Sequence, residues 1–178
     1  MKEKIIINEL NSDYDTLFEK ARALVFNEQN KIYVCNMNGT YMLPGGTVEN
    51  NESPLITLKR ELKEELGLIK YNLEELVEID YYHHNFPKLK SDLYENRLNI
   101  VYYYFIKIHS NDLGTQMLTD YEKEQNIRIE EYSIEEIKEK IKFDNDNKYS
   151  NFTNKELQII LNYINEKGWF NELSNIGK

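Results

Sequence analysis

The sequence predicts a mixed α/β (α+β) domain in which helices pack on one mixed sheet. Segments rich in β-branched and aromatic residues alternate with segments whose leucines and isoleucines recur at helical spacing. Such a mixture is typical of a layered domain. The chain has 178 residues, of which 40% are hydrophobic, so it is long enough for one domain with a substantial core. We therefore expect a single domain over residues 1–178.

Five segments have the composition of strands. They cover residues 20–27, 31–37, 75–86, 97–108 and 126–132. The first two are joined by a short polar turn and predict a hairpin, and the next two are expected to pair antiparallel. Between the hairpin and the first helix, Pro44, Gly45 and Gly46 are expected to interrupt regular structure and to allow unusual backbone angles.

The first predicted helix runs from Pro54 to Leu66. Ser53 is a suitable N-cap, proline is favoured in the first helical position, and Gly67 is a suitable C-terminal stop. An apolar stripe at helical spacing is expected to face the core. It consists of Leu55, Leu58, Leu62 and Leu66.

Two further helices are predicted near the end of the chain. Residues 133–141 begin with a capping box formed by Ser133 and Glu136. A last helix over about 153–168 begins at Thr153 and carries a second apolar stripe. We expect this helix to pack on the core of its own domain.

Charge and composition exclude several classes of protein. The formal net charge is -9, from 31 acidic and 22 basic residues, which argues against a general binder of nucleic acid. No apolar run is long enough to span a membrane. The single cysteine, Cys35, cannot form an internal disulfide and is expected to be buried and inert. With no secretion signal at the start, we expect a cytoplasmic protein.

Three carboxylates lie close together on the first predicted helix. Glu61, Glu64 and Glu65 fall within an arc of roughly 100° beside the leucine stripe. Like charges at this spacing repel by a few tenths of a kcal/mol per pair, and a bound cation would reverse that effect. Clustered carboxylate oxygens suit Mg²⁺ or Mn²⁺, and Gly45 and Gly46 allow the backbone to approach the same ion or a phosphate.

These residues carry a resemblance to a known family. The constrained positions are Gly46, Glu52, Arg60, Glu61, Leu62, Glu64, Glu65, Gly67 and Leu68. Their order and spacing resemble the Nudix box, G-x5-E-x7-R-E-U-x-E-E-x-G-U, in which U is a bulky aliphatic residue, without a departure. The resemblance implies an α/β/α sandwich with a mixed sheet. It also implies Mg²⁺-dependent hydrolysis of a diphosphate linked to another group, with Mn²⁺ as an alternative ion.

The same resemblance implies roles for the box residues. Glu64 and Glu65 would be metal ligands, Glu61 would be a ligand or would position the attacking water, and the Gly45 carbonyl would be a further metal contact. Gly46 would help the loop to approach a phosphate. Glu52 and Arg60 would be supporting residues, with Arg60 holding a neighbouring carboxylate in a bidentate pair. The implied substrate is a (d)NTP, including oxidised forms, or another small nucleotide derivative.

The residues leave several questions open. A further acidic ligand could come from Glu122, Glu124, Glu130 or Glu131, and strand parity does not choose among them. The number of metal ions and the oligomeric state, with a homodimer as one option, are also open. Specificity is expected in the loops at 83–96 and 111–125.

Other polar and aromatic residues have both a structural and a functional interpretation. His83 and His84 are adjacent on a strand and are expected to point to opposite faces, so they do not suit one metal ion. Lys88 and Lys90 could contact a phosphate, although a solvated loop is the simpler interpretation. One or two of the strand aromatics are expected to meet a ligand. These aromatics are Tyr81, Tyr82, Tyr102, Tyr103, Tyr104 and Phe105.

Three rival functions remain. A non-catalytic ligand-sensing or interaction domain would usually lack some box carboxylates. An isoprenoid diphosphate isomerase would need a cysteine beside the site, and the place of Cys35 in the early hairpin argues against it. RNA end-processing is disfavoured by the acidic balance.

Overall fold

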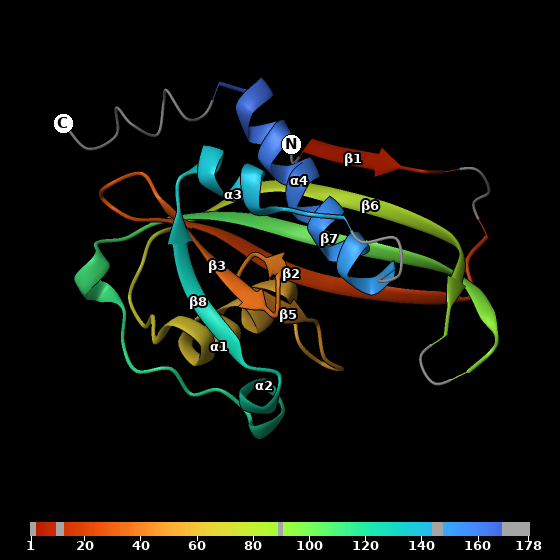
Figure 1. Cartoon of the computed structure of the whole chain (residues 1–178), viewed down its shortest axis with the longest axis horizontal. Helices are drawn as coiled ribbons and strands as arrows, with labels where there is room; N and C mark the ends of the chain where they lie inside the picture. The colour runs from red at the N-terminus through yellow and green to blue at the C-terminus, as the bar shows by residue number, and fades with distance from the viewer. Residues whose placement is uncertain (1–2, 10–12, 89–90, 144–147, 169–178) are drawn as a thin grey trace.

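The computed structural model describes residues 3–9, 13–88, 91–143 and 148–168. Within these ranges, helices cover both faces of one mixed eight-stranded sheet (Figure 1). The strands are β1 (Glu3–Ile7), β2 (Thr16–Phe26), β3 (Ile32–Met37), β4 (Thr40–Met42), β5 (Gly45–Thr47), β6 (Leu73–Pro87), β7 (Tyr94–Lys107) and β8 (Ile127–Tyr132). The helices are α1 (Pro54–Leu66), α2 (Asp120–Glu124), α3 (Ile134–Lys140) and α4 (Lys148–Glu166), with a 3-10 turn at Ser110–Asp112. The predicted fold class is confirmed.

The central strands run in the order β1-β6-β7-β2-β3-β4, with β5 paired to β2 and β8 paired to β3. The pairs β1–β6 and β2–β7 are parallel, and the remaining pairs are antiparallel. The predicted antiparallel pairing of the two long strands, β6 and β7, is therefore confirmed. The early hairpin is also present, but β2 and β3 pair only at Phe26 and Ile32 because β2 continues along β5 and β7.

The core has two parts, one on each face of the sheet. Helix α1 covers one face, where Leu58, Leu62 and Leu66 pack against alternate residues of β2 and β7. Helices α3 and α4 cover the other face, where Leu157 and Ile160 pack against the opposite set of strand residues. The apolar stripe of α4 therefore packs on the sheet of its own chain.

Two predictions for the region at and before the start of α1 are wrong. The segment around Pro44 is not wholly irregular, because it holds the short strands β4 and β5. Asn38 and Gly39 both have positive φ, at 51° and 91°. Positive φ at both central residues is typical of a tight two-residue hairpin turn, and this turn links β3 to β4. Leu55 also departs from the prediction, because it is exposed in the first turn of α1.

Helix α4 begins five residues before the predicted N-cap, Thr153. The side chain of Phe152 explains part of the extension, since its ring packs against Phe86 with 4.8 Å between centroids. Asn154 adds a polar anchor, because its side chain accepts a hydrogen bond from the Tyr41 N–H at 2.9 Å and donates one to the Lys142 carbonyl at 2.8 Å. These tertiary contacts hold the polar first turns of the helix against the sheet.

The C-terminal end of α1 is fixed by the segment that follows the 3-10 turn. The N–H of Gly114 donates to the Leu66 carbonyl at 3.0 Å, and the N–H of Met117 donates to the Glu64 carbonyl at 2.7 Å. These bonds satisfy carbonyls that a helix end leaves without partners. Gly67 and Gly114 lie so close that a side chain on either would meet the backbone of the other. The far end of α1 is thus held in place relative to the sheet.

Candidate functional site

The first functional element is α1, whose ends are those that the sequence predicts. The Ser53 hydroxyl accepts a hydrogen bond from the Ile56 N–H at 3.4 Å, and Gly67 ends the helix in the left-handed conformation with φ 65°. Leu58, Leu62 and Leu66 bury one side of the helix against the sheet. The carboxylates at the edge of this buried side are therefore held close to β5.

Arg60 binds several carboxylates at once. Its Nε and Nη2 each donate to a different oxygen of Glu52, both at 3.1 Å, which forms a bidentate pair. Its Nη1 donates to Glu61 at 2.8 Å and to Glu64 at 3.4 Å. The Arg60 guanidinium, followed by the Thr57 hydroxyl, lowers the pKa of Glu52 to about 2. Arg60 therefore orients the carboxylates on one side of α1.

Glu65 is the most buried of the three helix carboxylates, with 5% of the residue exposed. One carboxylate oxygen accepts a hydrogen bond from the Gly45 N–H at 2.8 Å, and the other lies 3.5 Å from the Cys35 sulfur. Burial raises the pKa of Glu65 to about 7. Burial also raises the pKa of Glu61, although Arg60 opposes that shift.

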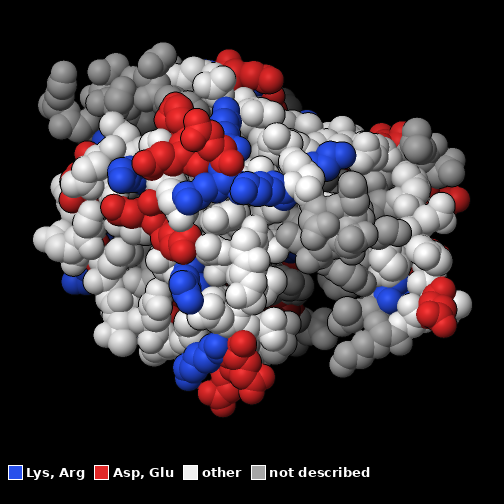
Figure 2. All heavy atoms as spheres, viewed as in Figure 1, with Lys and Arg blue, Asp and Glu red and all other residues white. Residues whose placement is uncertain are grey.

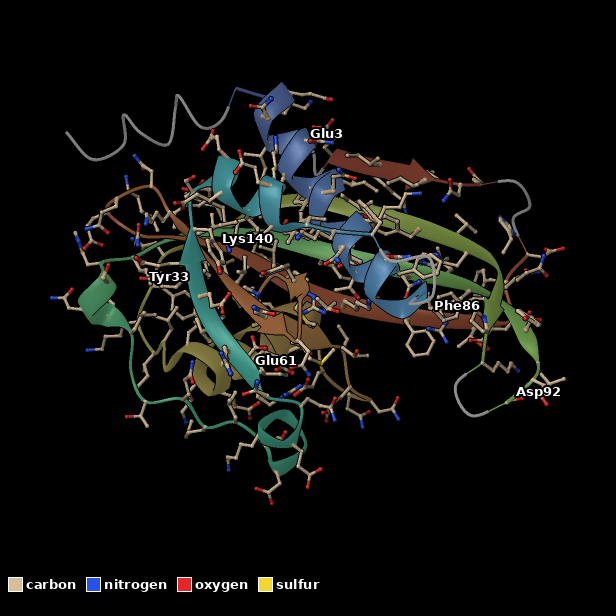
Figure 3. The ribbon with its side chains drawn as sticks, in the orientation of Figure 1. Glu3, Tyr33, Glu61, Phe86, Asp92 and Lys140 are labelled. Carbon is tan, nitrogen blue, oxygen red and sulfur yellow. The ribbon has the colours of Figure 1, made fainter. Side chains whose placement is uncertain are left out.

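Gly45 and Gly46 begin β5, and they are called the glycine loop below. This loop lies against α1 (Figure 3). A side chain at Gly46 would meet the carboxylate of Glu61. The loop is also fixed from the opposite side, because Nη1 of Arg22 donates to the carbonyls of Leu43 at 2.8 Å and Gly45 at 2.7 Å. The two glycines therefore lie between α1 and a buried arginine on β2.

The two glycines are expected to respond differently to alanine. Gly45 has φ 130°, and a methyl group there would meet the Ala21 carbonyl, so Gly45→Ala is expected to cost about 2–5 kcal/mol of stability. A methyl group at Gly46 would meet only the end of the Glu61 side chain, so Gly46→Ala is expected to cost about 1 kcal/mol. Urea denaturation of both variants measures this difference, and equal losses would contradict it.

The residues at the loop fit a hard divalent cation in their chemistry. Glu65 is buried without a described lysine or arginine in ion-pair contact, and Glu61 and Glu64 supply further carboxylate oxygens. In the described part of the chain, however, no three His, Cys, Asp or Glu side chains converge as a metal cluster would require. Arg60 supplies the positive charge between Glu61 and Glu64, because its Nη1 donates to both carboxylates. A cation that bound these two carboxylates would therefore displace the Arg60 guanidinium from them.

Cys35 is buried as predicted, with 1% exposed, but it lies next to the site. Its place in the early hairpin was taken as an argument against a cysteine beside the site. Cys35 does lie in that hairpin, on β3, but its sulfur is 3.5 Å from Glu65, so that argument is wrong. Residue 35 points toward α1 because it shares a face of β3 with Tyr33, which packs with Leu58 and Leu62.

The candidate acids outside the box that the structure describes either have other partners or are exposed. Glu130 accepts hydrogen bonds from Asn36 and Tyr132, and Glu131 accepts one from Asn27. Glu124 is exposed, and the side chain of Glu122 lies outside the part that the structure describes. Among the side chains that the structure describes, no contact joins these acids to the box carboxylates.

The paired histidines diverge, as the strand period predicts. The Nε2 of His84 lies 3.0 Å from the Asn8 carbonyl, whereas His83 packs against aromatic rings beneath α4. Lys88 forms an ion pair of 3.7 Å with Glu95, and Lys90 lies outside the described residues. None of these three described side chains has a contact with the box carboxylates.

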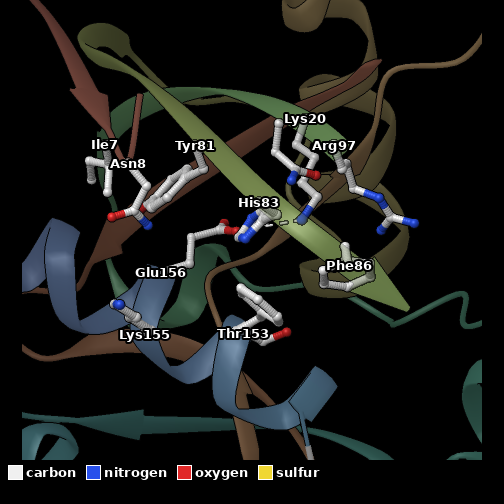
Figure 4. Close-up of a pocket in the computed structure, with 12 residues that line it drawn as sticks. Ile7, Asn8, Lys20, Tyr81, His83, Phe86, Arg97, Thr153, Lys155 and Glu156 are labelled. Atoms are coloured by element: carbon white, nitrogen blue, oxygen red, sulfur yellow. Dashed lines mark hydrogen bonds and ion pairs between the residues drawn. The ribbon is translucent and has the colours of Figure 1, made fainter. Parts of the chain in front are cut away.

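A cavity of about 150 Å³ lies between the sheet and the start of α4 (Figure 4). Its aromatic lining comes from Tyr81, His83, Phe86 and Phe152. Its polar lining comes from Asn8, Lys20, Arg97, Asn99, Thr153, Lys155 and Glu156. His83 and Phe86 lie in the range 83–96, where specificity is expected, and much of the remaining lining comes from β2, β7 and α4. The helix predicted only to close the core therefore also forms a cavity wall.

Arg22 connects this cavity to the glycine loop. Its Nε lies 4.0 Å from the Glu156 carboxylate that lines the cavity, while its Nη1 binds the Gly45 carbonyl. The sequence analysis gave no site role to Lys20, Arg22 or Glu156. The sequence did carry one signal for Lys20 and Arg22. Both lie in a predicted strand and share a face with Leu24, so two basic side chains were expected on a face that also carries an apolar residue.

The surface of the molecule agrees with the acidic composition. On the face shown in Figure 2, acidic side chains gather over α3, whose first turn contains Glu135 and Glu136. Basic side chains lie beside them. Among the described residues, no helix is long and apolar enough to cross a membrane.

A mixed sheet lies between helices, and a carboxylate-rich helix is set against the glycine loop. Residues 17–152 match the family model of the NUDIX domain. The chain therefore belongs to the NUDIX family, as its sequence motif predicts.

Individual relatives are more distant. An 8-oxo-dGTP diphosphatase of Proteus vulgaris is 30% identical over 73 residues, which cover 38% of this chain and 62% of that protein. A MutT protein from Bacillus halodurans has 21% identity and a TM-score of 0.49, covering 68% of this chain and 72% of that one. A MutT protein from Methanosarcina mazei Go1 has 18% identity and a TM-score of 0.49, covering 80% of this chain and 94% of that one.

Proposed function

We propose that this protein is a cytoplasmic, divalent-metal-dependent pyrophosphohydrolase that cleaves a diphosphate bond in a small nucleotide. The observation that carries the proposal is the arrangement of three carboxylates, Glu61, Glu64 and Glu65, on a helix that faces a glycine loop. Membership of the NUDIX family supports the reaction class. The intact set of carboxylates supports catalysis over a purely ligand-sensing domain.

The helix carboxylates have distinct environments and therefore distinct proposed roles. Glu64 is 34% exposed in its side chain and is proposed as a metal ligand at the open side of the site. Glu65 is buried and is proposed as a ligand fixed by the Gly45 N–H. Glu61 is proposed either to bind the ion or to orient the attacking water. Arg60 and Glu52 are supporting residues that hold these side chains in position.

The loop is proposed to bring backbone groups to the phosphates. The Gly45 carbonyl already accepts one hydrogen bond from Arg22, and a carbonyl oxygen has a second lone pair that could serve an ion. The absence of a side chain at Gly46 leaves space beside Glu61. Bound Mg²⁺ or Mn²⁺ would neutralise phosphate oxygens and lower the pKa of a water molecule.

The substrate is proposed to be a nucleoside triphosphate, including oxidised forms, or another nucleotide derivative. The cavity between the sheet and α4 has an aromatic wall that suits a flat ring. The name of the Proteus vulgaris relative, an 8-oxo-dGTP diphosphatase, points to the same class of substrate. The chain spans 62% of the length of that relative.

A panel assay tests the proposal. The purified protein is incubated with Mg²⁺ and ordinary and oxidised nucleoside triphosphates, ADP-ribose, dinucleoside polyphosphates and nucleotide sugars, and released phosphate or pyrophosphate is measured. We expect Mg²⁺-dependent release from at least one nucleotide, abolished by EDTA. No hydrolysis of any member would favour the ligand-sensing alternative.

The contact between Cys35 and Glu65 is the one observation that favours a second function, isoprenoid diphosphate isomerisation. The cysteine is only 1% exposed, so it lies behind Glu65 rather than open to a substrate. We therefore keep hydrolysis as the first proposal. Incubation of isoprenoid diphosphates with the protein, followed by NMR, tests the alternative, and conversion that is lost in Cys35→Ala would support it.

A further inference from the structure

A second groove, with a volume of about 710 Å³, lies between α1, the segment that follows it and the end of β7. The segment after α1 passes beside the one that follows the 3-10 turn, where Gly67 and Gly114 nearly touch (Figure 1). The basic residues that line the groove are Lys59, Lys63, Lys70 and Lys107. The groove is therefore basic, although the chain has a net charge of -9.

Three of these lysines have no acidic partner among the described residues. Lys59, Lys63 and Lys70 are exposed, and none of them forms an ion pair in the part of the chain that the structure describes. Of the described lining residues, Asp112 is the one acid, and its carboxylate accepts a hydrogen bond from the His109 N–H at 2.8 Å. Other lysines of the chain do form ion pairs, and these are Lys4, Lys20, Lys88, Lys123 and Lys167. The charge of the three groove lysines is thus available to a ligand.

Local structure explains only part of the pair on α1. Lys63 lies in the last turn of the helix, where a cation is favoured by the helix dipole. Lys59 lies one turn earlier and gains little from the helix end, and the two ammonium groups repel each other at this spacing. An anion in the groove would offset that repulsion.

The end of α1 does not present free carbonyls to such an anion. The carbonyls of Leu62, Leu66 and Glu64 accept hydrogen bonds from N–H groups beyond the helix, at 3.1, 3.0 and 2.7 Å. These bonds reduce the negative partial charge that a helix C-terminus carries. The positive charge of the lysines therefore dominates this end of the helix.

The groove is separate from the box carboxylates. At roughly 100° per residue, Lys59 and Lys63 lie on nearly the opposite side of α1 from Glu61 and Glu64. The buried leucines lie between the two sides and face the sheet. No box carboxylate is among the described residues that line the groove. One helix thus carries an acidic site on one side and a basic site on the other.

The lysines stand around a fixed apolar and aromatic surface. Leu68 is buried, and the half-buried ring of Tyr71 packs against the core that α1 covers. Burial raises the pKa of Tyr71, so its hydroxyl stays protonated and can donate a hydrogen bond. The groove therefore offers ammonium and hydroxyl donors on a surface that is already in place before a ligand arrives.

We propose that this groove binds a linear chain of phosphate groups, either free oligophosphate or the triphosphate of a nucleotide. Lysine binds phosphate as a point charge with no fixed planar geometry, so several lysines suit phosphates spaced along a flexible chain. The volume is far larger than a single phosphate needs. A long nucleic acid fits less well, because it would continue past the groove onto a surface that is acidic in net charge. This binding is independent of the proposed hydrolysis at the box.

Calorimetry in EDTA tests the proposal without divalent ions at the box. Sodium tripolyphosphate, orthophosphate and sulfate would be titrated into the full-length protein at equal ionic strength. We expect tripolyphosphate to bind at least about tenfold more tightly than orthophosphate or sulfate, and its affinity to fall as NaCl is added. No measurable binding of tripolyphosphate, or an affinity equal to that of sulfate, would overturn the inference.

Paired lysine variants assign the binding to the groove. Lys59→Gln/Lys63→Gln is expected to weaken tripolyphosphate binding by about tenfold, and glutamine keeps the helix propensity of lysine. Lys123→Gln/Lys155→Gln changes the net charge equally at two exposed lysines on α2 and α4, and should weaken binding by less than about twofold. Equal losses in the two double variants would contradict the proposal. Lys70→Gln, outside the helix, should weaken binding by about threefold and serves as the test if the first double variant does not fold.

Two further titrations locate the anion and identify its source. Glu65→Gln removes a charge at the box and should leave tripolyphosphate affinity in EDTA unchanged. An affinity that rises in Glu65→Gln and ignores the lysine substitutions would place the anion at the box and overturn the inference. ATP in the same buffer distinguishes the sources. An ATP affinity that falls with Lys59→Gln/Lys63→Gln would extend the groove's ligands to nucleotides, and an ATP affinity that does not fall would restrict them to free oligophosphate.

Discussion

Replacement of Glu65 by glutamine is expected to lower kcat of the proposed hydrolysis by about 10³-fold. Loss of a charged ligand weakens the stabilisation that a divalent ion gives to phosphate charge, which amounts to several kcal/mol, and each 1.36 kcal/mol is tenfold in rate. Glutamine keeps an oxygen that can accept the Gly45 N–H hydrogen bond, so the loop should stay in place. Steady-state kinetics with saturating Mg²⁺, together with thermal unfolding, measures both effects.

The matched controls separate this effect from a general loss of negative charge. Glu64→Gln, at the more open ligand position, is expected to lower kcat by a similar factor. Glu139→Gln, which changes an exposed carboxylate on α3, should leave kcat and KM unchanged. Near-full turnover in both Glu64→Gln and Glu65→Gln would contradict the assignment of these residues as metal ligands.

The parts of the site that were predictable from sequence are those encoded locally. The bounds of α1 follow from Ser53, Pro54 and Gly67, because capping and φ preferences act within a few residues. The sequence also predicts a bidentate pair of Arg60 with a neighbouring carboxylate, and in the structure that carboxylate is Glu52. Local rules and a family motif were sufficient for both features.

Other parts depend on strand pairing and so could not be predicted. Arg22 reaches the Gly45 carbonyl because β2 pairs with β5, which places Arg22 opposite Gly45. The face of the sheet on which Cys35 lies likewise depends on the pairing of β3 with its neighbouring strands. A single sequence gives the alternation of residues along a strand but not which face meets which helix.

The start of α4 illustrates a different limit. The sequence predicts that the last helix begins at Thr153, yet the helix extends back to Lys148. Phe152 gains contacts with His83 and Phe86 that no local pattern reveals. The same extension turns Glu156 from an expected first-turn residue into part of the cavity lining, where it meets Lys20 and Arg22.

The burial of Glu65 also has a consequence for stability in the absence of metal. Its pKa is about 7 in the folded protein and 4.5 in the ordinary reference state, so the folded state binds the proton more tightly. This contribution to stability is fully present below pH 4.5 and is lost as pH rises through 7. At 1.36 kcal/mol per unit, the loss is on the order of 3 kcal/mol.

In EDTA, Glu65→Gln is therefore expected to become progressively more stable than the unmodified protein between pH 4.5 and pH 8. The glutamine side chain is neutral and escapes the cost of burying a charge. Urea denaturation across this pH range measures the difference, which should grow by on the order of 3 kcal/mol. Because the comparison is between two proteins, the titration of groups such as Glu52 affects both alike.

Addition of Mg²⁺ at pH 8 should reverse the order. An ion that binds the folded state stabilises it in proportion to the logarithm of its concentration over Kd, and the charged Glu65 binds the ion more strongly than glutamine does. The unmodified protein should thus gain stability with Mg²⁺, while Glu65→Gln gains much less. Parallel pH profiles in EDTA would show that Glu65 does not carry the buried charge, and equal Mg²⁺ responses would show that it does not bind the ion.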